Sequence, residues 1–294
     1  MAVVVLIGGC ASDVVRLTRA AENGDAEAQY GLGMRYADVA VAEANKWFLK
    51  AAEQGHAKAQ ANLGVAYAFG LGVDKDAAEA VKWYRKAAEQ GNAGAQLGLG
   101  LCYSKGDGVE KDAVEAFKWI RQSAEQGYVE AQGYLGVHYY AGAGVAKDAA
   151  EAVKWLRKAA EHGHDQAQCV LGWCYYKGDG VSKDHVEAAR WLRKAAGQGH
   201  AAAQHSLGAI YAESGNIGRD AAEAVRWFRK AAEQGYAMAQ FSLGECYLAG
   251  RGVMQNTAEA VRWFRKAAEQ GLAEAQEALE KLGGREGMSS GKLD

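Results

Sequence analysis

Apolar and polar residues alternate with a helical period over residues 76–91, DAAEAVKWYRKAAEQG. Val81, Tyr84 and Ala88 follow one another at intervals of three or four residues and fall on one stripe, whereas Lys82 lies on the opposite side. A stripe of this kind is typical of a helix that buries one side and exposes the other. The segment is therefore predicted to form an amphipathic α-helix that ends at a glycine.

The same sixteen-residue pattern returns along the chain at a fixed interval. Further copies begin at Asp112, Asp148, Asp184, Asp220 and Asn256. Seven tryptophans mark one position of the pattern and lie 36 residues apart: Trp47, Trp83, Trp119, Trp155, Trp191, Trp227 and Trp263. A fixed period of this length indicates stacked copies of one helical unit, each too small to bury its apolar side alone. We therefore predict an all-α solenoid of about seven helix-turn-helix repeats.

Each repeat also contains a first helix, which in one copy is expected over residues 57–69. Gln60, Leu63 and Tyr67 are predicted to form its inward side. Gly64 lies in the middle of this helix, although glycine there costs about 1 kcal/mol relative to alanine. Because glycine recurs at this place along the chain, we predict that two helices approach each other closely at that point.

The segments between the helices have two recurring features. Asp76 precedes the second helix and Glu79 follows three residues later, which predicts a capping box in which the glutamate reaches back to the helix start. The connector at residues 70–73, GLGV, returns as GDGV, GAGV, GDGV and GRGV. It lacks the preceding strand and the third glycine of a dinucleotide-binding loop. We interpret it as a helix–helix turn whose valine docks against the core.

The ends of the array depart from the repeat. Residues 12–24 align with the second half of a repeat, and residues 272–282 form a lone first helix. Both are predicted to be degenerate capping helices, because terminal repeats must turn a more polar side to water. The solenoid is expected to span residues 12–282, and residues 283–294 are expected to form a mobile polar tail. The connectors at residues 37–46 and 214–217 deviate most and should be the least regular.

Residues 1–11, MAVVVLIGGCA, do not match the repeat and are too short to span a bilayer. They resemble the end of a bacterial lipoprotein signal, with Cys10 at the place of the acylated cysteine, although no Lys or Arg precedes the apolar run. A frayed or docked apolar N-terminus explains the segment equally well. On the first interpretation the chain is anchored to a membrane through Cys10 only, which slightly favours the bacterial cell envelope over the cytoplasm.

Composition and charge exclude several classes of protein. The chain has 294 residues, of which 49% are hydrophobic and 24% charged, as in ordinary folded proteins. Its net charge is −2, and no block of like charge suggests nucleic-acid binding. Cys102, Cys174 and Cys246 share one place in alternate repeats, which a stacked array would hold far apart. We therefore expect small core residues rather than disulfides.

The complete repeat combines A-x-A-Q-x-x-L-G-x-x-Y, G-x-G-V, D-x-x-E-A and W-x-x-K-A-A-E-Q-G. It resembles the Sel1-like repeats, relatives of the tetratricopeptide repeats, over about residues 12–282. The resemblance implies a right-handed α-solenoid whose concave face is made mainly by first helices. It also implies an adaptor or scaffold role, known in the family from bacterial envelope assembly, signalling and host contact. The cysteine-rich branch of the family pairs cysteines within each unit, and this chain does not follow that pattern.

Partner binding is expected at the first-helix positions that vary between repeats, because the constant positions hold the scaffold together. Aromatic residues are concentrated in the middle of the chain, where Trp173 is the only tryptophan outside the 36-residue series. By analogy with tetratricopeptide grooves, we predict that a protein or peptide binds a concave face that contains Tyr134, Tyr140, Trp173, Tyr176, Lys105, Lys177, His205 and Phe241. The alternative is that Trp173 and the tyrosines fill gaps between first helices.

A hydrolase acting on cell-wall or β-lactam substrates is the second hypothesis. Residues 289–292, SSGK, match the S-x-x-K motif of penicillin-recognising enzymes, but they lie in the predicted tail without the companion motifs. The recurring Asp/Glu pairs are explained by capping. The histidines at 162, 164, 200 and 205 are interpreted as surface or turn residues, because no Cys or carboxylate set completes a metal site. We therefore predict a non-catalytic interaction scaffold with no catalytic residue, metal or cofactor.

Overall fold

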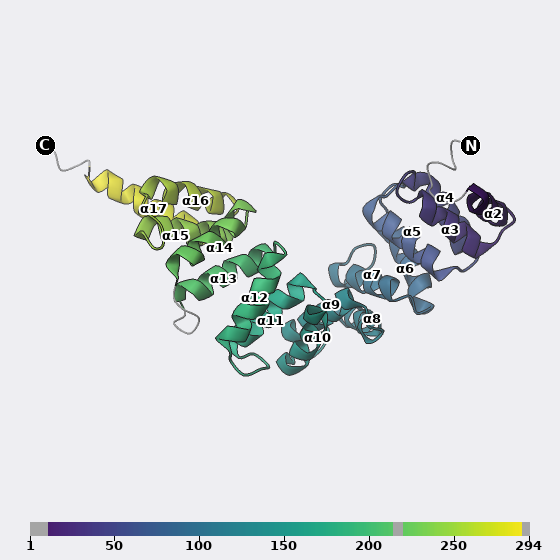
Figure 1. Cartoon of the computed structure of the whole chain (residues 1–294), viewed down its shortest axis with the longest axis horizontal. Helices are drawn as coiled ribbons and strands as arrows, with labels where there is room; N and C mark the ends of the chain where they lie inside the picture. Colours follow the sequence, from purple (N-terminus) through teal and green to yellow (C-terminus); the bar gives the residue numbers. More distant parts are fainter. Residues whose placement is uncertain (1–10, 214–219, 290–294) are drawn as a thin grey trace. The chain divides into compact units, whose positions relative to one another are not determined.

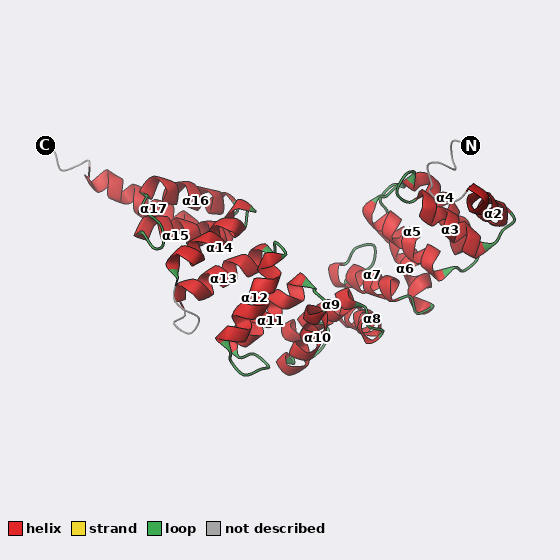
Figure 2. Ribbon diagram, in the orientation of Figure 1, coloured by secondary structure: helices red, strands yellow, loops and turns green. Residues whose placement is uncertain are grey.

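The computed structural model describes residues 11–213 and 220–289 (Figure 1). Within these residues every regular element is an α-helix and no strand occurs (Figure 2). The chain divides into two compact units, Met1–Asp148 and Ala149–Asp294. The helices of the first unit are α2 (Ala11–Glu22), α3 (Ala26–Tyr36), α4 (Val41–Glu53), α5 (Ala57–Phe69), α6 (Ala77–Glu89), α7 (Ala93–Lys105), α8 (Ala113–Glu125) and α9 (Val129–Ala141). Those of the second are α10 (Ala149–Glu161), α11 (Asp165–Lys177), α12 (His185–Gly197), α13 (Ala201–Glu213), α14 (Ala221–Glu233), α15 (Ala237–Ala249), α16 (Thr257–Glu269) and α17 (Ala273–Ser289).

Within each unit, a helix packs mainly against the helices that precede and follow it in the chain. The most extensive contacts join the two helices of one repeat, as in α5 with α6 and α11 with α12. Helix α5 begins and ends where the sequence pattern placed it, at Ala57 and Phe69. The predicted architecture of repeated helical hairpins is therefore confirmed.

Tryptophans of the 36-residue series join consecutive repeats. The indole of Trp83 belongs to a buried cluster with Ala44, Phe48 and Leu63, which come from the preceding repeat and from α5. Trp119, Trp227 and Trp263 occupy corresponding places in the clusters around Ala80, Ala188 and Ala224. The indoles thus belong to separate clusters along the chain, as a stack of hairpins requires and a single globular core does not.

A helix glycine lets the two helices of one repeat approach each other, as the sequence predicts. A Cβ atom on Gly100 of α7 would lie 2.7 Å from Cγ1 of Ile120 and 3.1 Å from the carbonyl oxygen of Ala116, both on α8. Real Cβ atoms do not show the shorter of these distances. The contact is made by a large second-helix side chain as well as by the backbone, so the glycine opens the space that this side chain fills.

The second glycine of the connector has a role that the sequence did not predict. Gly108 has φ of +72°, and a Cβ atom there would overlap the carbonyl group of Ala77 at the start of α6. Gly144 meets Ala113 in the same way. The connector therefore packs against the second helix of the preceding repeat, and it contributes to the joint between repeats. Val109 of the same connector packs against the apolar cluster around Leu99, as predicted.

The predicted capping box is only half present. Asp76 Oδ1 accepts a hydrogen bond from the Glu79 backbone N–H at 2.9 Å, as expected for an N-cap. The Asp76 backbone N–H donates instead to the carbonyl oxygen of Tyr67 on α5, at 3.0 Å. The prediction that the glutamate reaches back is therefore wrong, because the donor it would bind is already used. Glu79 forms an ion pair with Lys82 at 2.7 Å.

A buried glutamine connects three helices in most repeats. Gln60 is 4% exposed, and its Nε2 donates to the carbonyl oxygen of Ala52 at the end of α4. Its Oε1 accepts from Nε2 of Gln90, which follows α6, at 2.7 Å. Equivalent pairs recur at Gln96 with Gln126, Gln168 with Gln198, Gln204 with Gln234, and Gln240 with Gln270. Gln132 differs, because its buried Oε1 has no partner among the described residues.

The ends of the array agree only in part with the sequence-based boundaries. Helix α2, Ala11–Glu22, is the expected N-terminal capping helix. Helix α17 continues beyond the expected end at residue 282 to Ser289. The connector before α4 is irregular as expected, since Ala40 at its N-cap provides no side-chain hydrogen bond. The deviating connector at 214–217 and Cys10 lie outside the described residues.

The helix glycine gives the first testable prediction. Gly100→Ala should lower the free energy of unfolding by about 1–3 kcal/mol, because the added methyl group overpacks the contact with Ile120. Gly94→Ala in the same helix is the matched control, since its Cβ atom would meet only ordinary contacts at 3.5 Å or more. It should be neutral or stabilising by up to about 1 kcal/mol. Urea unfolding followed by circular dichroism measures both, and equal effects would contradict the packing argument.

The half capping box gives the second prediction. Asp76→Ala should cost about 1 kcal/mol of stability, because α6 loses its N-cap acceptor. Glu79→Gln should cost less than about 0.5 kcal/mol, because it removes only an exposed ion pair with Lys82. Denaturant titration of the two variants distinguishes the roles. Stability losses of equal size in the two variants would contradict this division of roles.

Candidate functional site

Three of the predicted site residues lie together on α11. The rings of Trp173 and Tyr176 are perpendicular, with centroids 5.4 Å apart. Lys177 Nζ lies 5.6 Å from the centroid of the Trp173 ring. All three side chains come from the last two turns of one helix, where Trp173 lies three and four residues before the other two and therefore on the same side as each of them. They form a half-buried aromatic group with a cation at its edge.

The aromatic group of α11 is connected to α13 through a carboxylate. The Tyr176 hydroxyl donates to Oε2 of Glu213 at 3.0 Å. Burial, together with this carboxylate, raises the pKa of Tyr176 above its ordinary value. Trp173, Tyr176 and Glu213 line a small cavity of about 150 Å³, with Leu192 and Ile210 on its inner side. Trp173 thus packs against the core on one side and borders a cavity on the other.

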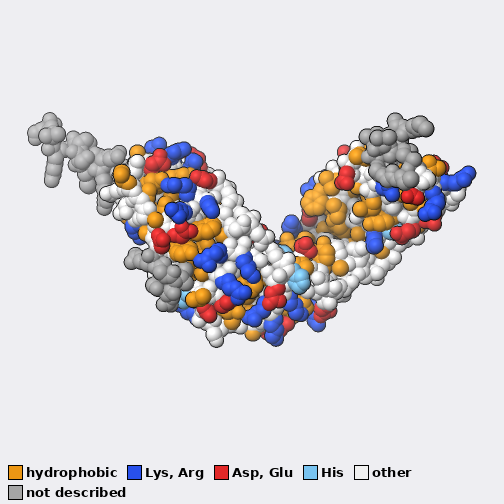
Figure 3. All heavy atoms as spheres, viewed as in Figure 1, with side chains coloured by type: hydrophobic (Ala, Val, Ile, Leu, Met, Phe, Trp, Pro, Cys, Tyr) orange, Lys and Arg blue, Asp and Glu red, His pale blue; other side chains and the backbone are white. Residues whose placement is uncertain are grey.

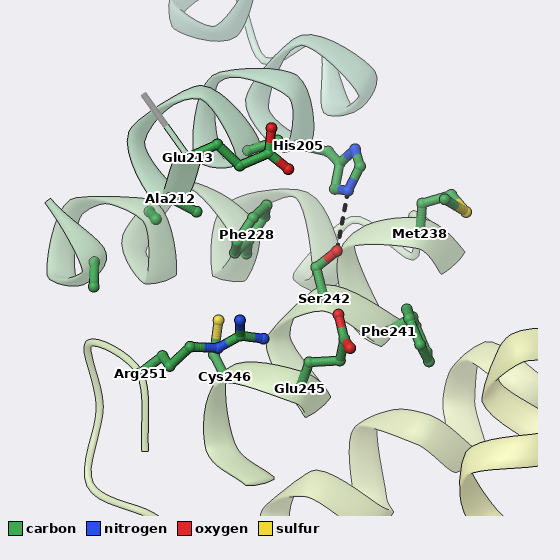
Figure 4. A pocket seen from close by; sticks show the side chains of 13 residues that line it. His205, Ala212, Glu213, Phe228, Met238, Phe241, Ser242, Glu245, Cys246 and Arg251 are labelled. Atoms are coloured by element: carbon green, nitrogen blue, oxygen red, sulfur yellow. Dashed lines mark hydrogen bonds between the residues drawn. The ribbon is translucent and has the colours of Figure 1, made fainter. Parts of the chain in front are cut away.

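His205 and Phe241, on α13 and α15, line a larger cavity of about 760 Å³ (Figure 4). Phe228 of α14 forms part of its wall, and Met238 of α15, which is 41% exposed, stands at its edge. The two cavities share Ala209 and Glu213 as lining residues. The structure therefore places five of the eight predicted residues along the neighbouring first helices α11, α13 and α15.

His205 forms a polar contact in the wall of the larger cavity. Its Nε2 lies 3.1 Å from Oγ of Ser242, and its ring packs against Phe228 and Tyr236 with centroid distances of 5.5 and 5.6 Å. Burial lowers the pKa of the imidazole below its ordinary value, so the neutral form is favoured. The predicted surface or turn position is therefore wrong for His205, which lies within α13 and is partly buried.

Ser242 and His205 lie as close together as a nucleophile and its general base. The surrounding groups, however, are not those of a catalytic site. Ser242 lies in the middle of α15, Ala237–Ala249, where backbone N–H groups bind carbonyl groups of the same helix. Such groups cannot form an oxyanion hole, which needs free donors directed at the reacting atom. The two residues therefore form a structural hydrogen bond that connects α13 with α15.

The other three predicted residues, Tyr134, Tyr140 and Lys105, belong to the first compact unit. Lys105 is exposed at the end of α7, and Tyr134 is half-buried on α9. The ring of Tyr140 is approached by Nζ of Lys147 at 5.5 Å from its centroid. These residues form no cluster comparable to that on α11, α13 and α15.

Sequence reasoning missed the charged residues of the larger cavity. Glu213 stands at the repeat position of Lys177, and Glu245 at that of Trp173. Both line the cavity, as does Arg251 of the following connector. The sequence did contain a signal for Glu213 and Glu245, because both stand at the variable first-helix positions from which the aromatic site residues were chosen. Their charge gave no reason to prefer them over other exposed residues.

An exposed apolar surface in the first unit was also missed. Phe69 at the end of α5 is 71% exposed, and Met34, Val65 and Leu71 are exposed as well. Figure 3 shows apolar side chains gathered over α5 in the first unit and over α14 and α15 in the second. Met34 and Val65 occupy the repeat position of Trp173. This position is therefore outward-facing in both units.

Other histidines cap first helices. His56, His164 and His200 precede α5, α11 and α13, and the Nδ1 atom of each accepts a backbone N–H three residues later at 3.1–3.2 Å. Asn92 does the same for α7 with its amide oxygen. These imidazoles thus stabilise helix starts. The described residues contain no group of three or more side chains suited to hold a metal ion.

The described cysteines are free thiols, as expected from their positions in the repeat. Burial raises the pKa of Cys174 to about 11 and that of Cys169 to about 12. A thiol with so high a pKa is a poor nucleophile at neutral pH. None of the helices in the described part of the chain has the length and apolar content needed to cross a bilayer.

Comparison with known families decides the classification of the repeat. The Sel1 repeat model matches seven successive segments: residues 26–56, 57–92, 93–128, 129–164, 165–200, 201–236 and 237–272. The chain belongs to the Sel1 repeat family. Proteins of this family are generally protein-interaction scaffolds, and the solenoid fold is typically non-catalytic. No protein with a curated description matches the chain.

Solved structures similar to this Sel1 repeat protein include two with more than 30% identity. One is c5321, a protective antigen of uropathogenic Escherichia coli, with 41% identity and a TM-score of 0.79. The match covers 94% of this chain and 60% of the E. coli chain, so the present chain spans less than two thirds of that structure. The other is a Sel1 repeat protein of Oxalobacter formigenes, with 35% identity, a TM-score of 0.72, and coverage of 94% and 83%.

The environment of His205 generates a prediction for this Sel1 repeat protein. Burial lowers the folded-state pKa below the ordinary 6.5, so protonation favours the unfolded state. The stability contributed by the neutral imidazole is fully present at pH values above 6.5. It is lost as the pH falls from there through the folded-state pKa. The melting temperature of the wild type should therefore fall more between about pH 7.5 and about pH 5 than that of His205→Gln. Parallel melting curves with the same pH dependence would contradict the assignment.

Proposed function

We propose that this protein is a non-catalytic scaffold that binds a peptide or an exposed segment of another protein on its first-helix side. The main site is the surface formed by α11, α13 and α15, hereafter the α11–α15 surface. One observation carries the proposal: side chains at the variable repeat positions line two cavities that share Ala209 and Glu213. Constant positions are used for packing, so the variable ones are available for a partner.

The chemistry of the α11–α15 surface suits a protein ligand. Phe241 and Trp173 are half-buried and present large apolar areas at the edges of cavities. Met238 adds a flexible thioether that adapts to irregular apolar shapes. Aromatic anchors surrounded by polar groups are typical of binding hot spots. Since the backbone groups within helices are already paired, recognition must depend on side chains rather than on added strands.

Membership of the family supports the same conclusion, because Sel1 repeat proteins generally bind proteins. The hydrolase hypothesis gains no support from the site. The cavity residues offer a serine in a helix whose backbone donors are used, and a single thiol, Cys246, whose pKa is raised by burial. A turnover assay with nitrocefin remains the direct test of that hypothesis, and turnover abolished by a single substitution would overturn the scaffold proposal.

Quantitative affinity capture tests the α11–α15 surface. Partners are captured from source cells by the wild-type chain, identified by mass spectrometry, and then titrated individually. Phe241→Ala should weaken the affinity for the principal partner by about 2 kcal/mol, because an aromatic anchor is removed from the cavity wall. Trp173→Ala should act in the same direction. Val186→Ala, an exposed apolar truncation on the second helix α12, is the matched control and should have no effect.

Melting curves of the same variants separate binding from folding. Phe241 contacts Phe264 with ring centroids 5.4 Å apart, so its truncation is expected to lower the melting temperature to some degree. The proposal requires that the loss of affinity persists at a temperature where each variant is fully folded. Stability losses without any change in partner affinity would show that these side chains only fill the core.

A further inference from the structure

The cavity between α13, α14 and α15 has an apolar inner surface. Ala224 is completely buried, and Phe228 and Cys246 are 5% and 6% exposed. Phe241 and Met238 extend this surface toward the edge (Figure 4). Its volume of about 760 Å³ falls in the range of pockets that hold small ligands, roughly 300–1,000 Å³. The cavity is thus large enough for at least one long side chain of a partner.

His205 contributes a polar but uncharged group to the wall. Its Nε2 is engaged with Ser242 Oγ, and the ring is packed between Phe228 and Tyr236. Burial keeps the pKa of this imidazole low, so that it adds no positive charge at neutral pH. Burial also raises the pKa of the Cys246 thiol, so the charge of the described lining is decided by three remaining side chains.

Those three side chains are two carboxylates and one guanidinium. Glu213 comes from α13 and Glu245 from α15, and Figure 4 shows them on either side of the cavity. Neither has an ion-pair partner within 4.0 Å among residues 11–213 and 220–289. Arg251 is the only cation among the described lining residues, and it also lacks such a partner. The described lining therefore carries an excess of one negative charge.

One of the carboxylates is already oriented. The Tyr176 hydroxyl donates to Oε2 of Glu213, and this tyrosine is itself held by the rings of Trp173 and His185 at centroid distances of 5.4 and 5.1 Å. An acceptor fixed by a neighbouring group loses less side-chain entropy when it binds a ligand. Glu213 is therefore better prepared to receive a donor than an ordinary surface glutamate.

We propose that the cavity receives a single Lys or Arg side chain from the bound segment, with its cation between Glu213 and Glu245 and its aliphatic stem against Phe228 and Phe241. This inference rests on the proposed function and names the residue type that the site selects. Lys and Arg combine an apolar stem with a charged end, which matches the apolar inner surface and the two carboxylates. Arg251 disfavours a second basic residue beside the first, so the preferred segment has an isolated basic residue flanked by apolar ones.

Fixed-position peptide pools provide the test. Hexapeptides with blocked termini carry Lys, Arg, Gln, Glu or Leu at the third position and mixtures of the other residues elsewhere, and each pool is titrated against the full chain at physiological salt. The Lys and Arg pools should bind at least about tenfold more tightly than the Gln and Glu pools, as expected for charge-assisted hydrogen bonds. Arg251→Gln should strengthen binding of the Lys pool, because it removes a neighbouring positive charge.

Two double variants distinguish local contact from overall charge. Glu213→Gln with Glu245→Gln should abolish the preference for Lys and Arg. Glu53→Gln with Glu89→Gln removes the same charge from exposed positions in the first unit and should leave the preference intact. Circular dichroism and melting curves verify that each variant is folded.

The remaining outcomes each overturn the proposal. Equal binding of all pools, tightest binding of the Glu pool, or no binding of any pool would show that the cavity does not select a basic residue. Retention of the preference in the Glu213/Glu245 double variant would place the basic residue elsewhere. If the pools bind equally and Phe241→Ala weakens all of them, the scaffold function stands while the basic anchor fails. If cellular partner capture is also unaffected by Phe241→Ala, the proposed function fails as well.

Discussion

The structure depends on the joint between consecutive repeats. A single hairpin of two short helices cannot bury its own apolar side, so its stability comes from the contact with the neighbouring hairpin. Trp83 provides that contact by joining the cluster of the preceding repeat around Phe48. The connector glycine reinforces it, because only the absence of a side chain at Gly108 allows the chain to lie against Ala77. A large apolar ring and a missing side chain thus act together at this joint.

The buried glutamines make the stacking specific. An unpaired amide in the interior is costly, so Gln60 is acceptable only where Ala52 and Gln90 supply its partners. This requirement fixes the register of three helices at once, which apolar packing alone would specify less strictly. With the constant positions committed to tryptophan, glycine and glutamine contacts, the variable positions of the first helices can differ between repeats without breaking those contacts. That division explains how a repetitive scaffold can hold a distinctive surface.

The α11–α15 surface arises from small differences between repeats. The residue after the repeat tryptophan is Phe228 in α14 but Leu192 in α12, and Glu213 replaces the lysine found at position 177. These exchanges leave the helices in place and change what faces the space between them. Both the aromatic group around Tyr176 and the acidic cavity around Glu245 result from such exchanges. Function in this molecule is therefore expected to follow the exceptions to the repeat rather than the repeat itself.

The sequence by itself determined the repeat, the helix limits such as Ala57–Phe69, the Asp76 cap and the inert cysteines, because each depends on local spacing or recurs in register. Only the tertiary structure decided that Glu79 does not reach back, since the competing bond comes from Tyr67, nine residues away on another helix. It also decided that Glu213 and Glu245 share one cavity. Burial and pairing of a side chain depend on neighbours from other helices, and the pattern along one helix does not contain that information.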